Sequence, residues 1–305
     1  MLDYRDIVDY VLLVFQKKTL EPISEEESIE ISEIVQKAQS GNKVSAQAVS
    51  GNFCKQFCVF YLYILFLDLS HKNPFYSVML ESPLSAAIEI LSADNGVHRL
   101  NVVDGDGRVR GILSQTDIVK FLISKRALFQ DIFNSTLSDL KIGCGPVVSV
   151  NSEASVLEAL EKMSENFISS VAVIESDGTL IGNISMADIR FVFQHGRYHR
   201  LWMTCGNFLS LALNQKGLEH SGNDQFPFFD AHLTSSLSQV MAKIVATKVH
   251  RVWVTNPNNQ HLIGLVSLTD IIGLFYEKSF KAIDEADREK EMDAVESIGA
   301  DGEDY

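Results

Sequence analysis

"HRLNVVDGDGRVRGILSQTD", residues 98–117, contains two short strand-like runs around an Asp-Gly-Asp-Gly turn and ends in Thr-Asp, where a helix is expected to begin. Similar stretches follow at residues 169–188, "SSVAVIESDGTLIGNISMAD", and at residues 250–270, "HRVWVTNPNNQHLIGLVSLTD". In each copy a Gly precedes an Asp by six residues: Gly111 and Asp117, Gly182 and Asp188, and Gly264 and Asp270. Internal similarity in a fixed register predicts a repeat architecture.

Each hairpin is preceded by a stretch in which apolar side chains recur three or four positions apart, as on one face of a helix. These side chains are Leu84, Ile88 and Leu91, then Val156, Leu160 and Met163, and finally Leu237, Met241 and Ile244. A second apolar run follows each Asp, at residues 118–124, 189–194 and 271–276. The unit is therefore helix, strand, turn, strand, helix in about 60 residues, which predicts an α/β repeat fold.

A partial fourth copy opens the chain, where "MLDYRDIVDYVLLVF" matches the end of the unit and Asp6 takes the place of Asp117. Either the first module is incomplete in nature or the true start lies upstream, and we favour the second, because half a module exposes an apolar helix face and a sheet edge. The expected segments are the end of a first module (1–18), a linker with a helix and an atypical apolar run (19–72), the second, third and fourth modules (73–127, 140–196 and 226–278), and an acidic disordered tail (281–305).

The composition of the 305 residues, 46% hydrophobic and 22% charged, is that of a globular protein. A formal net charge of −14 argues against a broad electrostatic contact with nucleic acid or an anionic membrane. Residues 281–305 carry 10 acidic and 3 basic side chains, so half of this charge lies in the tail. The four cysteines have neither zinc-site spacing nor the density of a disulfide scaffold, so we expect reduced thiols in an intracellular protein and no bound metal.

Residues 53–69, "FCKQFCVFYLYILFLDL", form the most apolar stretch of the chain. Its uninterrupted apolar core, residues 58–67, is shorter than the ~20 residues that a membrane-spanning helix needs. A buried strand or helix is the favoured interpretation. A membrane span and an error in the gene model are the alternatives.

The repeated Asp residues lie at strand-to-helix turns beside hydroxyl side chains. One interpretation is that each carboxylate is a helix N-cap, which typically contributes about 1 kcal/mol. The other is that a carboxylate and its hydroxyl neighbours bind the two vicinal hydroxyls of a ribose. The two roles are compatible. The candidate hydroxyl side chains are Ser114 and Thr116 in the second module, and Ser267 and Thr269 in the fourth.

Two His-Arg pairs, His98-Arg99 and His250-Arg251, begin the first hairpin strand of the second and fourth modules. Taken alone, either pair is best interpreted as two solvent-exposed side chains at the end of a strand. A guanidinium that grips phosphate oxygens in bidentate fashion beside an imidazole donor is also a good anion receptor. In the third module the same places hold Ser169 and Ser170, small hydroxyls that leave room for a ligand.

These repeats resemble cystathionine β-synthase (CBS) modules, which pair into Bateman-type discs and bind adenosyl compounds. The order "VHRLNVVD", "ISSVAVIESDGTLIGNIS" and "VHRVWVTN", with "LSDLKIG" between the second and third modules, is similar to the γ subunit of the AMP-activated protein kinase. The resemblance covers about residues 1–18 and 73–278. It implies that modules one and two form one half of the disc, and modules three and four the other.

The resemblance implies a non-catalytic, energy-sensing γ subunit in cytoplasm and nucleus, with the catalytic α and scaffold β subunits as partners. AMP, ADP and ATP would be regulatory ligands, and no cofactor is implied. The implied ribose contacts are Asp188, Asp270 and Asp6, and the implied phosphate contacts are His98, Arg99, His250 and Arg251, helped by hydroxyls such as Ser169 and Ser267. Asp117 is retained where animal γ subunits have lost the acid, which adds a further candidate site.

Two rival functions remain. An enzyme is disfavoured, because no Ser-His-Asp, metal or P-loop constellation is left once the modules are assigned. The alternative is a CBS regulator of the yeast phosphatase-regulator type, or another CBS scaffold for adenosyl ligands. Kinase and phosphatase partners would use the same fold, so the fold does not separate them.

Overall fold

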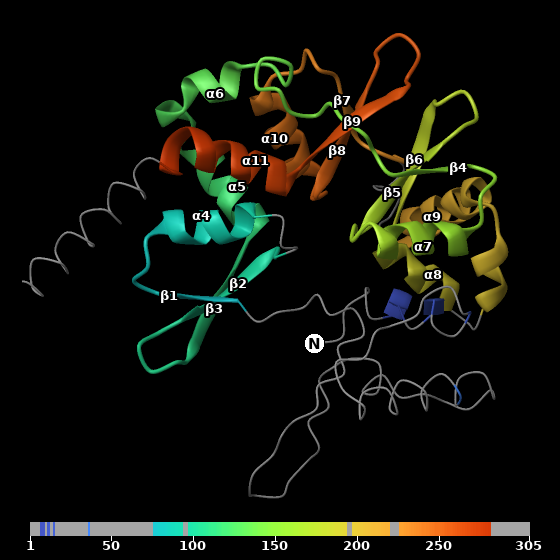
Figure 1. Ribbon diagram of the computed structural model, residues 1–305, viewed down its shortest axis with the longest axis horizontal. Coiled ribbons are helices and arrows are strands. Elements are labelled where there is room, and N and C mark those ends of the chain that lie inside the picture. Colours follow the sequence, from blue (N-terminus) through green and yellow to red (C-terminus); the bar gives the residue numbers. More distant parts are fainter. Residues whose placement is uncertain are drawn as a thin grey trace, which may run out of the picture. The chain divides into compact units, whose positions relative to one another are not determined.

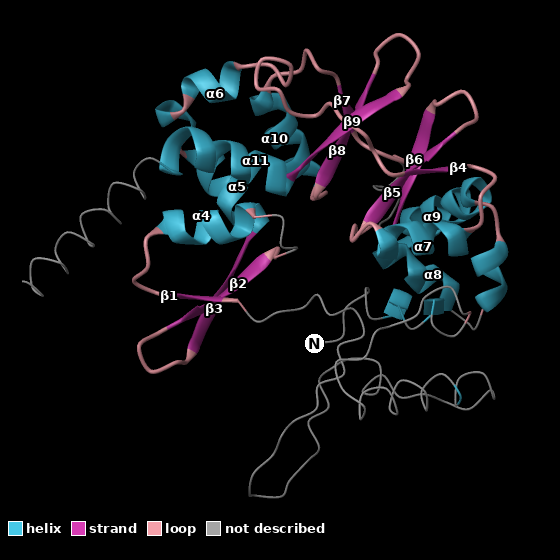
Figure 2. Cartoon of the chain, in the orientation of Figure 1, coloured by secondary structure: helices cyan, strands magenta, loops and turns pink. Residues whose placement is uncertain are grey.

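The computed structural model describes residues 7–9, 11–12, 15, 36, 76–93, 97–193, 197–219 and 226–281. Figures 1 and 2 show three small sheets, each accompanied by helices. The strand orders are β1-β2-β3, β4-β5-β6 and β7-β8-β9, so each sheet is built from consecutive strands of one repeat. The predicted α/β repeat fold with three modules in tandem is confirmed.

The elements of the three modules follow one order. Module 2 contains β1 (Ser77–Met79), α4 (Leu84–Ser92), β2 (Arg99–Val103), β3 (Val109–Ser114) and α5 (Gln115–Ser124). Module 3 contains β4 (Ser149–Asn151), α7 (Val156–Glu165), β5 (Ser170–Ile174), β6 (Leu180–Ser185), a 3₁₀ turn (Met186–Ile189) and α8 (Arg190–Phe193). Module 4 contains β7 (Asp230–Ala231), α10 (Leu237–Thr247), β8 (Arg251–Thr255), β9 (Leu262–Ser267) and α11 (Leu268–Phe275). The connecting segments include 3₁₀ turns at Arg126–Leu128 and Tyr198–Trp202, α6 (Gln130–Asn134), α9 (Cys205–Glu219) and a π turn at Tyr276–Phe280.

Each module carries a leading strand that the sequence pattern does not predict. β1 pairs in parallel with β2, and β4 pairs in parallel with β5. The hairpin strands β2 and β3, and β5 and β6, pair antiparallel as expected. The leading strands have only two or three residues, too few to give a recognisable alternation of apolar and polar side chains.

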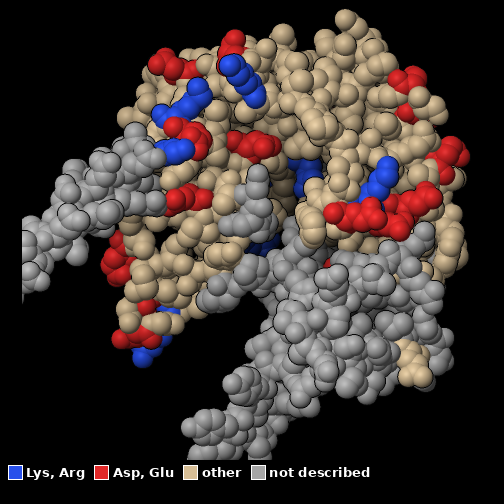
Figure 3. Space-filling view, viewed as in Figure 1, with Lys and Arg blue, Asp and Glu red and all other residues tan. Residues whose placement is uncertain are grey.

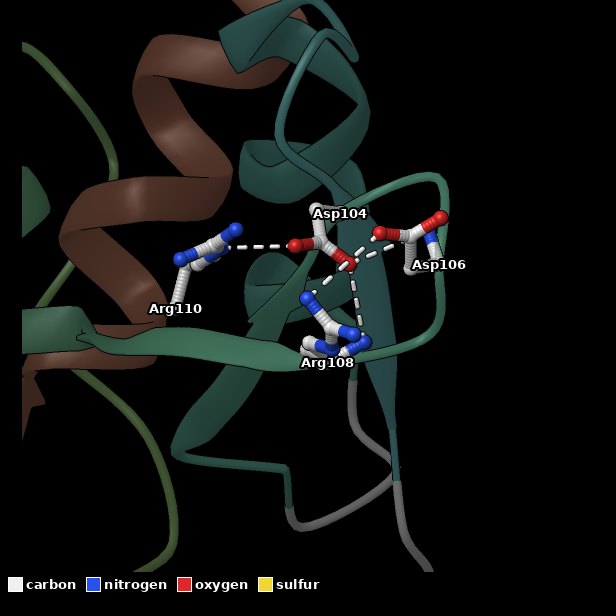
Figure 4. A network of polar contacts seen from close by, with 4 residues as sticks. All are labelled: Asp104, Asp106, Arg108 and Arg110. Atoms are coloured by element: carbon white, nitrogen blue, oxygen red, sulfur yellow. Dashed lines mark hydrogen bonds and ion pairs between the residues drawn. The ribbon is translucent and has the colours of Figure 1, made fainter.

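The β2–β3 turn is organised by the carboxylate of Asp104 (Figure 4). Its Oδ1 accepts hydrogen bonds from the backbone N–H groups of Asp106 (3.1 Å) and Arg108 (2.9 Å), and its Oδ2 accepts one from Arg110 Nε at 2.6 Å. The Arg108 N–H is the main cause of a lowered Asp104 pKa. Asp side chains that accept from the backbone two residues on typically fix tight turns. The turn thereby sets the register of the hairpin whose far end carries the candidate site.

The chain divides into two compact units. The first, called here the module 2–4 unit, comprises the described residues of 74–144, 231–254 and 265–281. In it α11 packs against α4 and α5, and α10 packs against α5 and α6. Its fully buried side chains include Ile88, Leu122, Phe133, Met241, Trp253 and Phe275. The apolar faces predicted for α4 and α10 therefore pack in one core.

The second unit, called here the module 3 unit, comprises the described residues of 7–15, 145–230 and 255–264. Residues 7–9 and 11–12 are helical, and Val8, Val11 and Leu12 are buried in one core with α7 and β5. Ser164 of α7 donates a hydrogen bond to the buried Asp9 (2.7 Å). The partial first copy thus packs against module 3, while Asp6 lies outside the described residues.

The modules pair through two different surfaces. Helices join module 2 to module 4, which the expected pairing of one with two and three with four does not include. Hairpin ends join module 3 to the tip of module 4: Leu180 N–H donates to Gln260 O (3.1 Å), and Leu262 N–H donates to Gly178 O (3.2 Å). Module 4 therefore contacts module 2 through its helices and module 3 through the tip of its hairpin.

Two expectations fall on residues outside the described part, namely the apolar stretch 53–69 and nearly all of the acidic tail. Among the helices that the structure does describe, none has the length and apolar composition required to cross a bilayer.

Candidate functional site

The repeated Asp residues occupy the third position of a helix, and serines are the N-caps. The Ser114 hydroxyl accepts from Asp117 N–H (3.3 Å), while Asp117 Oδ2 accepts from the Ser114 N–H (3.1 Å) and hydroxyl (2.6 Å). Ser267 and Asp270 repeat this capping box at 3.2, 2.7 and 2.7 Å. The interpretation of each Asp as an N-cap is therefore wrong, because the shorter serine side chain reaches the free N–H and the acid closes the box.

The capping box uses one carboxylate oxygen and leaves the other available. Asp117 and Asp270 are exposed, and within the described part of the chain Oδ1 of each has no hydrogen bond or ion pair. The Ser114 hydroxyl holds the pKa of Asp117 below its usual value. Modules 2 and 4 thus each present a charged acceptor at a strand-to-helix turn. Thr116 and Thr269, beside them, are half-buried.

Asp188 in module 3 is placed differently. It is buried, its Oδ2 accepts from the Ser185 N–H (2.9 Å) and hydroxyl (2.8 Å), and its Oδ1 lies 2.7 Å from Lys216 Nζ on α9. The start of β5 holds Ser169 and Ser170 as expected, and the Ser170 hydroxyl is buried. The module 3 acid is therefore already paired within the chain.

The two His-Arg pairs occupy equivalent positions. Arg99 and Arg251 are the first residues of β2 and β8. His98 O accepts from Gln115 N–H (3.1 Å), and His250 O accepts from Leu268 N–H (3.0 Å), so each pair is tied to the start of the following helix. Arg99 also lies opposite Ser114 in the β2–β3 register. Each candidate phosphate contact is therefore next to a candidate ribose contact.

The structure brings the His-Arg pairs of modules 2 and 4 together. The pKa of His250 is lowered by burial, then by the charge of Arg251, and then by the charge of Arg99 from the other module. The His250 side chain is exposed at its edge of the protein, yet neighbouring protein atoms and the two arginines disfavour its charged form. Residues about 150 positions apart in sequence thus share one electrostatic environment.

Gln115 is a site residue that the sequence analysis missed. It is buried, and its Nε2 donates to Leu91 O (2.9 Å) and to Thr269 Oγ1 (2.9 Å). These bonds fix the amide orientation, so Oε1 accepts from His98 Nδ1 (3.2 Å). The available signal was its polarity, because Met186 and Leu268 hold the equivalent first helical position in the other modules. Gln115 therefore links His98 of module 2 to Thr269 of module 4.

The central polar cluster, as we name it, consists of residues contributed by modules 2 and 4. Its members are His98, Arg99, Gln115, His250, Arg251 and Thr269. Elsewhere, on the face that Figure 3 presents, basic and acidic side chains of described residues are interspersed without one broad basic field. Chemically, the cluster offers two guanidinium groups and two imidazoles to an anion, with a carboxylate acceptor one residue beyond Thr269.

Comparison with known proteins gives the family. The model of the CBS domain matches residues 68–124, 141–195 and 227–277, more than half of the chain. The chain belongs to the CBS domain family. The resemblance drawn from the repeated Gly-to-Asp element is thereby confirmed.

Several yeast proteins match along most of the chain. Protein SDS23 of Kluyveromyces lactis is 34% identical over 311 residues, covering 92% of this chain and 54% of that protein. Protein SDS23 of Candida glabrata is 36% identical, covering 84% of this chain and 44% of that protein. Protein SDS24 of Saccharomyces cerevisiae is 34% identical, covering 84% of this chain and 46% of that protein. The chain spans about half the length of these relatives.

These relatives overturn the expectation of a kinase γ subunit with α and β partners. The alternating His-Arg, Ser-Ser, His-Arg pattern suggested that assignment, but chain-wide identity lies with SDS23 and SDS24. The pattern describes the chemistry of module strand ends, and it does not specify which protein the modules regulate.

Solved structures agree on the fold. A Methanocaldococcus jannaschii protein, described as an archaeal homologue of the AMP-activated kinase γ subunit, aligns with a TM-score of 0.58 at 13% identity over 90% of this chain and 82% of that one. An uncharacterized conserved protein of Pyrococcus horikoshii aligns with a TM-score of 0.50 at 17% identity over 66% and 79%. At these identities the likeness shows the fold alone.

Proposed function

We propose that this chain is a regulatory CBS protein without catalysis of its own, which binds an adenine nucleotide at the central polar cluster and acts on a protein phosphatase. The observation that carries the nucleotide site is the action of Arg99, from module 2, on the pKa of His250 in module 4. Arg99 of one pair and His250 of the other thereby lie within electrostatic reach of each other.

Electrostatics favour a phosphate as the anion. Arg99 and Arg251 both disfavour the charged form of the His250 imidazole, as the lowered pKa of His250 indicates. A bound phosphate relieves this repulsion and accepts bidentate hydrogen bonds from arginine. Binding is therefore expected to raise the pKa of His250.

The sugar contact is expected at Asp270, next to Thr269 in the cluster. Its available Oδ1 suits the vicinal hydroxyls of a ribose. Asp117 offers the equivalent acceptor in module 2. AMP, ADP and ATP combine a ribose with phosphates and differ in charge and length, so each would favour a different arrangement of the modules.

The choice of a phosphatase as the proposed partner follows from the comparison with the yeast relatives. The sequence left two regulatory classes open, and because the matches to the yeast proteins SDS23 and SDS24 overturn the kinase subunit, the yeast phosphatase-regulator class is the one that we retain. Since the chain spans about half of their length, a partner surface elsewhere in those proteins is compatible with this proposal.

Two measurements test the proposal. Thermal melting of the full chain with millimolar AMP, ADP or ATP should show a raised melting temperature, and GTP should raise it less, because a ligand that binds only the folded state stabilises it. Affinity purification of the tagged full chain, followed by mass spectrometry, should recover a phosphatase catalytic subunit. A flat response to every adenine nucleotide removes the proposed nucleotide site, and recovery without any phosphatase removes the proposed class of partner.

A further inference from the structure

The repeated Asp of module 3 differs in burial and pairing from the equivalent Asp of modules 2 and 4. Asp117 and Asp270 are exposed, whereas Asp188 is only 3% exposed. Oδ2 of Asp188 is taken by Ser185, as in the other capping boxes, but Oδ1 is paired with Lys216 Nζ at 2.7 Å. The oxygen that stays available in modules 2 and 4 is therefore occupied in module 3.

Helix α9, which carries Lys216, also covers the sheet of module 3. It packs against β6 and α7, as Figure 1 shows. A Cβ atom added at Gly182 on β6 would lie 2.2 Å from Leu209 Cδ2 of α9. A Cβ atom at the equivalent Gly111 of module 2 would have nothing within 4 Å. The same strand position is therefore covered by α9 in module 3, and in module 2 no described residue covers it.

Two buried side-chain oxygens, one on β5 and one on α9, have no hydrogen bond among the described residues. These oxygens are Ser170 Oγ and Gln215 Oε1. Ser170 is 5% exposed and lies opposite Ser185 in the β5–β6 register, and Gln215 precedes Lys216 on α9. Buried polar groups are nearly always hydrogen-bonded, so such exceptions mark a place where a bonding partner is missing. Ser170 is thus the register partner of the N-cap serine of the Asp188 box, and Gln215 is the chain neighbour of the Lys216 of the ion pair.

We propose that α9 is an intramolecular cap on a ligand position in module 3. The Lys216 ammonium group takes the place beside Asp188 Oδ1 that a ligand hydroxyl would take. This ligand position therefore accepts a ligand only when α9 moves away from it. The inference rests on the proposed function for the ligand class, a ribose. Because Ser169 and Ser170 stand where modules 2 and 4 carry His-Arg pairs, the opened position has no cation pair for phosphate. It suits a neutral nucleoside such as adenosine better than AMP.

The test measures adenosine and AMP stoichiometry by titration calorimetry on the full chain. Lys216→Met removes the ammonium but keeps an apolar stem, so it should add one adenosine site that the wild type lacks. Adding Asp188→Asn to Lys216→Met should abolish that site, and AMP should fill it at least tenfold more weakly than adenosine. Unchanged stoichiometry in a folded Lys216→Met protein overturns the cap.

A second variant covers the case in which Lys216→Met does not fold. Leu209→Ala weakens the apolar docking of α9 and keeps both residues of the ion pair, so α9 should undock more often and expose the same Asp188-dependent adenosine site. If the wild type binds no AMP while either variant gains adenosine, the proposed nucleotide function fails and the cap stands. If the wild type binds AMP and neither variant gains adenosine, the cap alone fails. No binding in any protein overturns both.

Discussion

Gln115 of module 2 donates a hydrogen bond to Thr269 of module 4 at 2.9 Å, across 154 positions of sequence. The same amide donates to Leu91 O and accepts from His98, so one buried side chain connects the two modules and orients an imidazole of the central polar cluster. Thr269 in turn precedes Asp270, the acid of module 4. A shift of one module is therefore transmitted to candidate ligand contacts of both.

Replacing Gln115 with Leu, the residue at the equivalent place in module 4, should destabilise the module 2–4 unit. The Leu91 carbonyl and the Thr269 hydroxyl lose their donor, and a polar group left buried and unpaired costs about 1–3 kcal/mol. Urea unfolding measures the loss. AMP affinity should also fall, because His98 loses the acceptor that orients it. An unchanged free energy of unfolding would mean that the link is not maintained in solution.

Asp270→Asn separates capping from ligand binding. Asparagine keeps an oxygen that accepts from Ser267 but removes the charge offered to a ribose, so AMP affinity should fall about tenfold or more, corresponding to roughly 1.5–3 kcal/mol for a charge-assisted hydrogen bond. The matched control is Asp139→Asn, since Asp139 closes the same kind of box with Thr136 and lies outside the cluster. Titration calorimetry measures the AMP affinity of both variants. Equal affinities in both, with lower stability for Asp270→Asn, would assign Asp270 to structure alone.

Arg251→Gln should weaken AMP and ATP about tenfold or more and leave adenosine nearly unaffected, because only the phosphate contacts the guanidinium. The salt dependence of AMP binding should also become shallower. Arg99→Gln should behave alike. Arg108→Gln removes an equal charge at the exposed β2–β3 turn and serves as the control. Equal losses for adenosine and AMP in Arg251→Gln would show that the arginine supports the site without contacting phosphate.

His250 should make the empty module 2–4 unit less stable in mild acid. Its folded pKa lies below the ordinary value of 6.5, because burial, Arg251 and Arg99 all disfavour the imidazolium. The unfolded chain therefore binds the proton first, and the free energy of unfolding should fall as the pH drops below about 6.5. At pH 8 both states are neutral and the contribution is absent. Urea unfolding of the wild type and of His250→Gln at pH 8 and pH 5.5 measures this pH dependence, which the substitution should reduce. An equal change in the free energy of unfolding between the two pH values in both proteins would contradict the assignment.

Gly182→Ala and Gly111→Ala form a matched pair at equivalent strand positions. The first places a methyl group against the buried Leu209, which should cost about 1–3 kcal/mol of overpacking. The second meets open space and should stay within about 0.5 kcal/mol of the wild type. Equilibrium unfolding measures both. Adding Leu209→Ala to Gly182→Ala should recover part of the loss, and no recovery would place the strain elsewhere.

The sequence by itself determined what is local to a repeat. The Gly-to-Asp spacing, the alternation of the hairpin strands and the helical apolar faces depend on backbone periods of two and 3.6 residues, so three modules and the CBS family were readable from one chain. The positions of the His-Arg pairs at the starts of β2 and β8 were readable for the same reason. The leading strands were too short to give such a pattern.

Only the tertiary structure decided which side chains meet. That Arg99 acts on His250, that Gln115 bonds Thr269, and that Lys216 pairs with Asp188 all depend on the packing of segments far apart in sequence, and no local period encodes that packing. The capping geometry was likewise decided by distance, because a serine hydroxyl reaches the free N–H and the acid three residues later closes the box. Three acids that look equivalent in sequence therefore become two open acceptors and one buried ion pair.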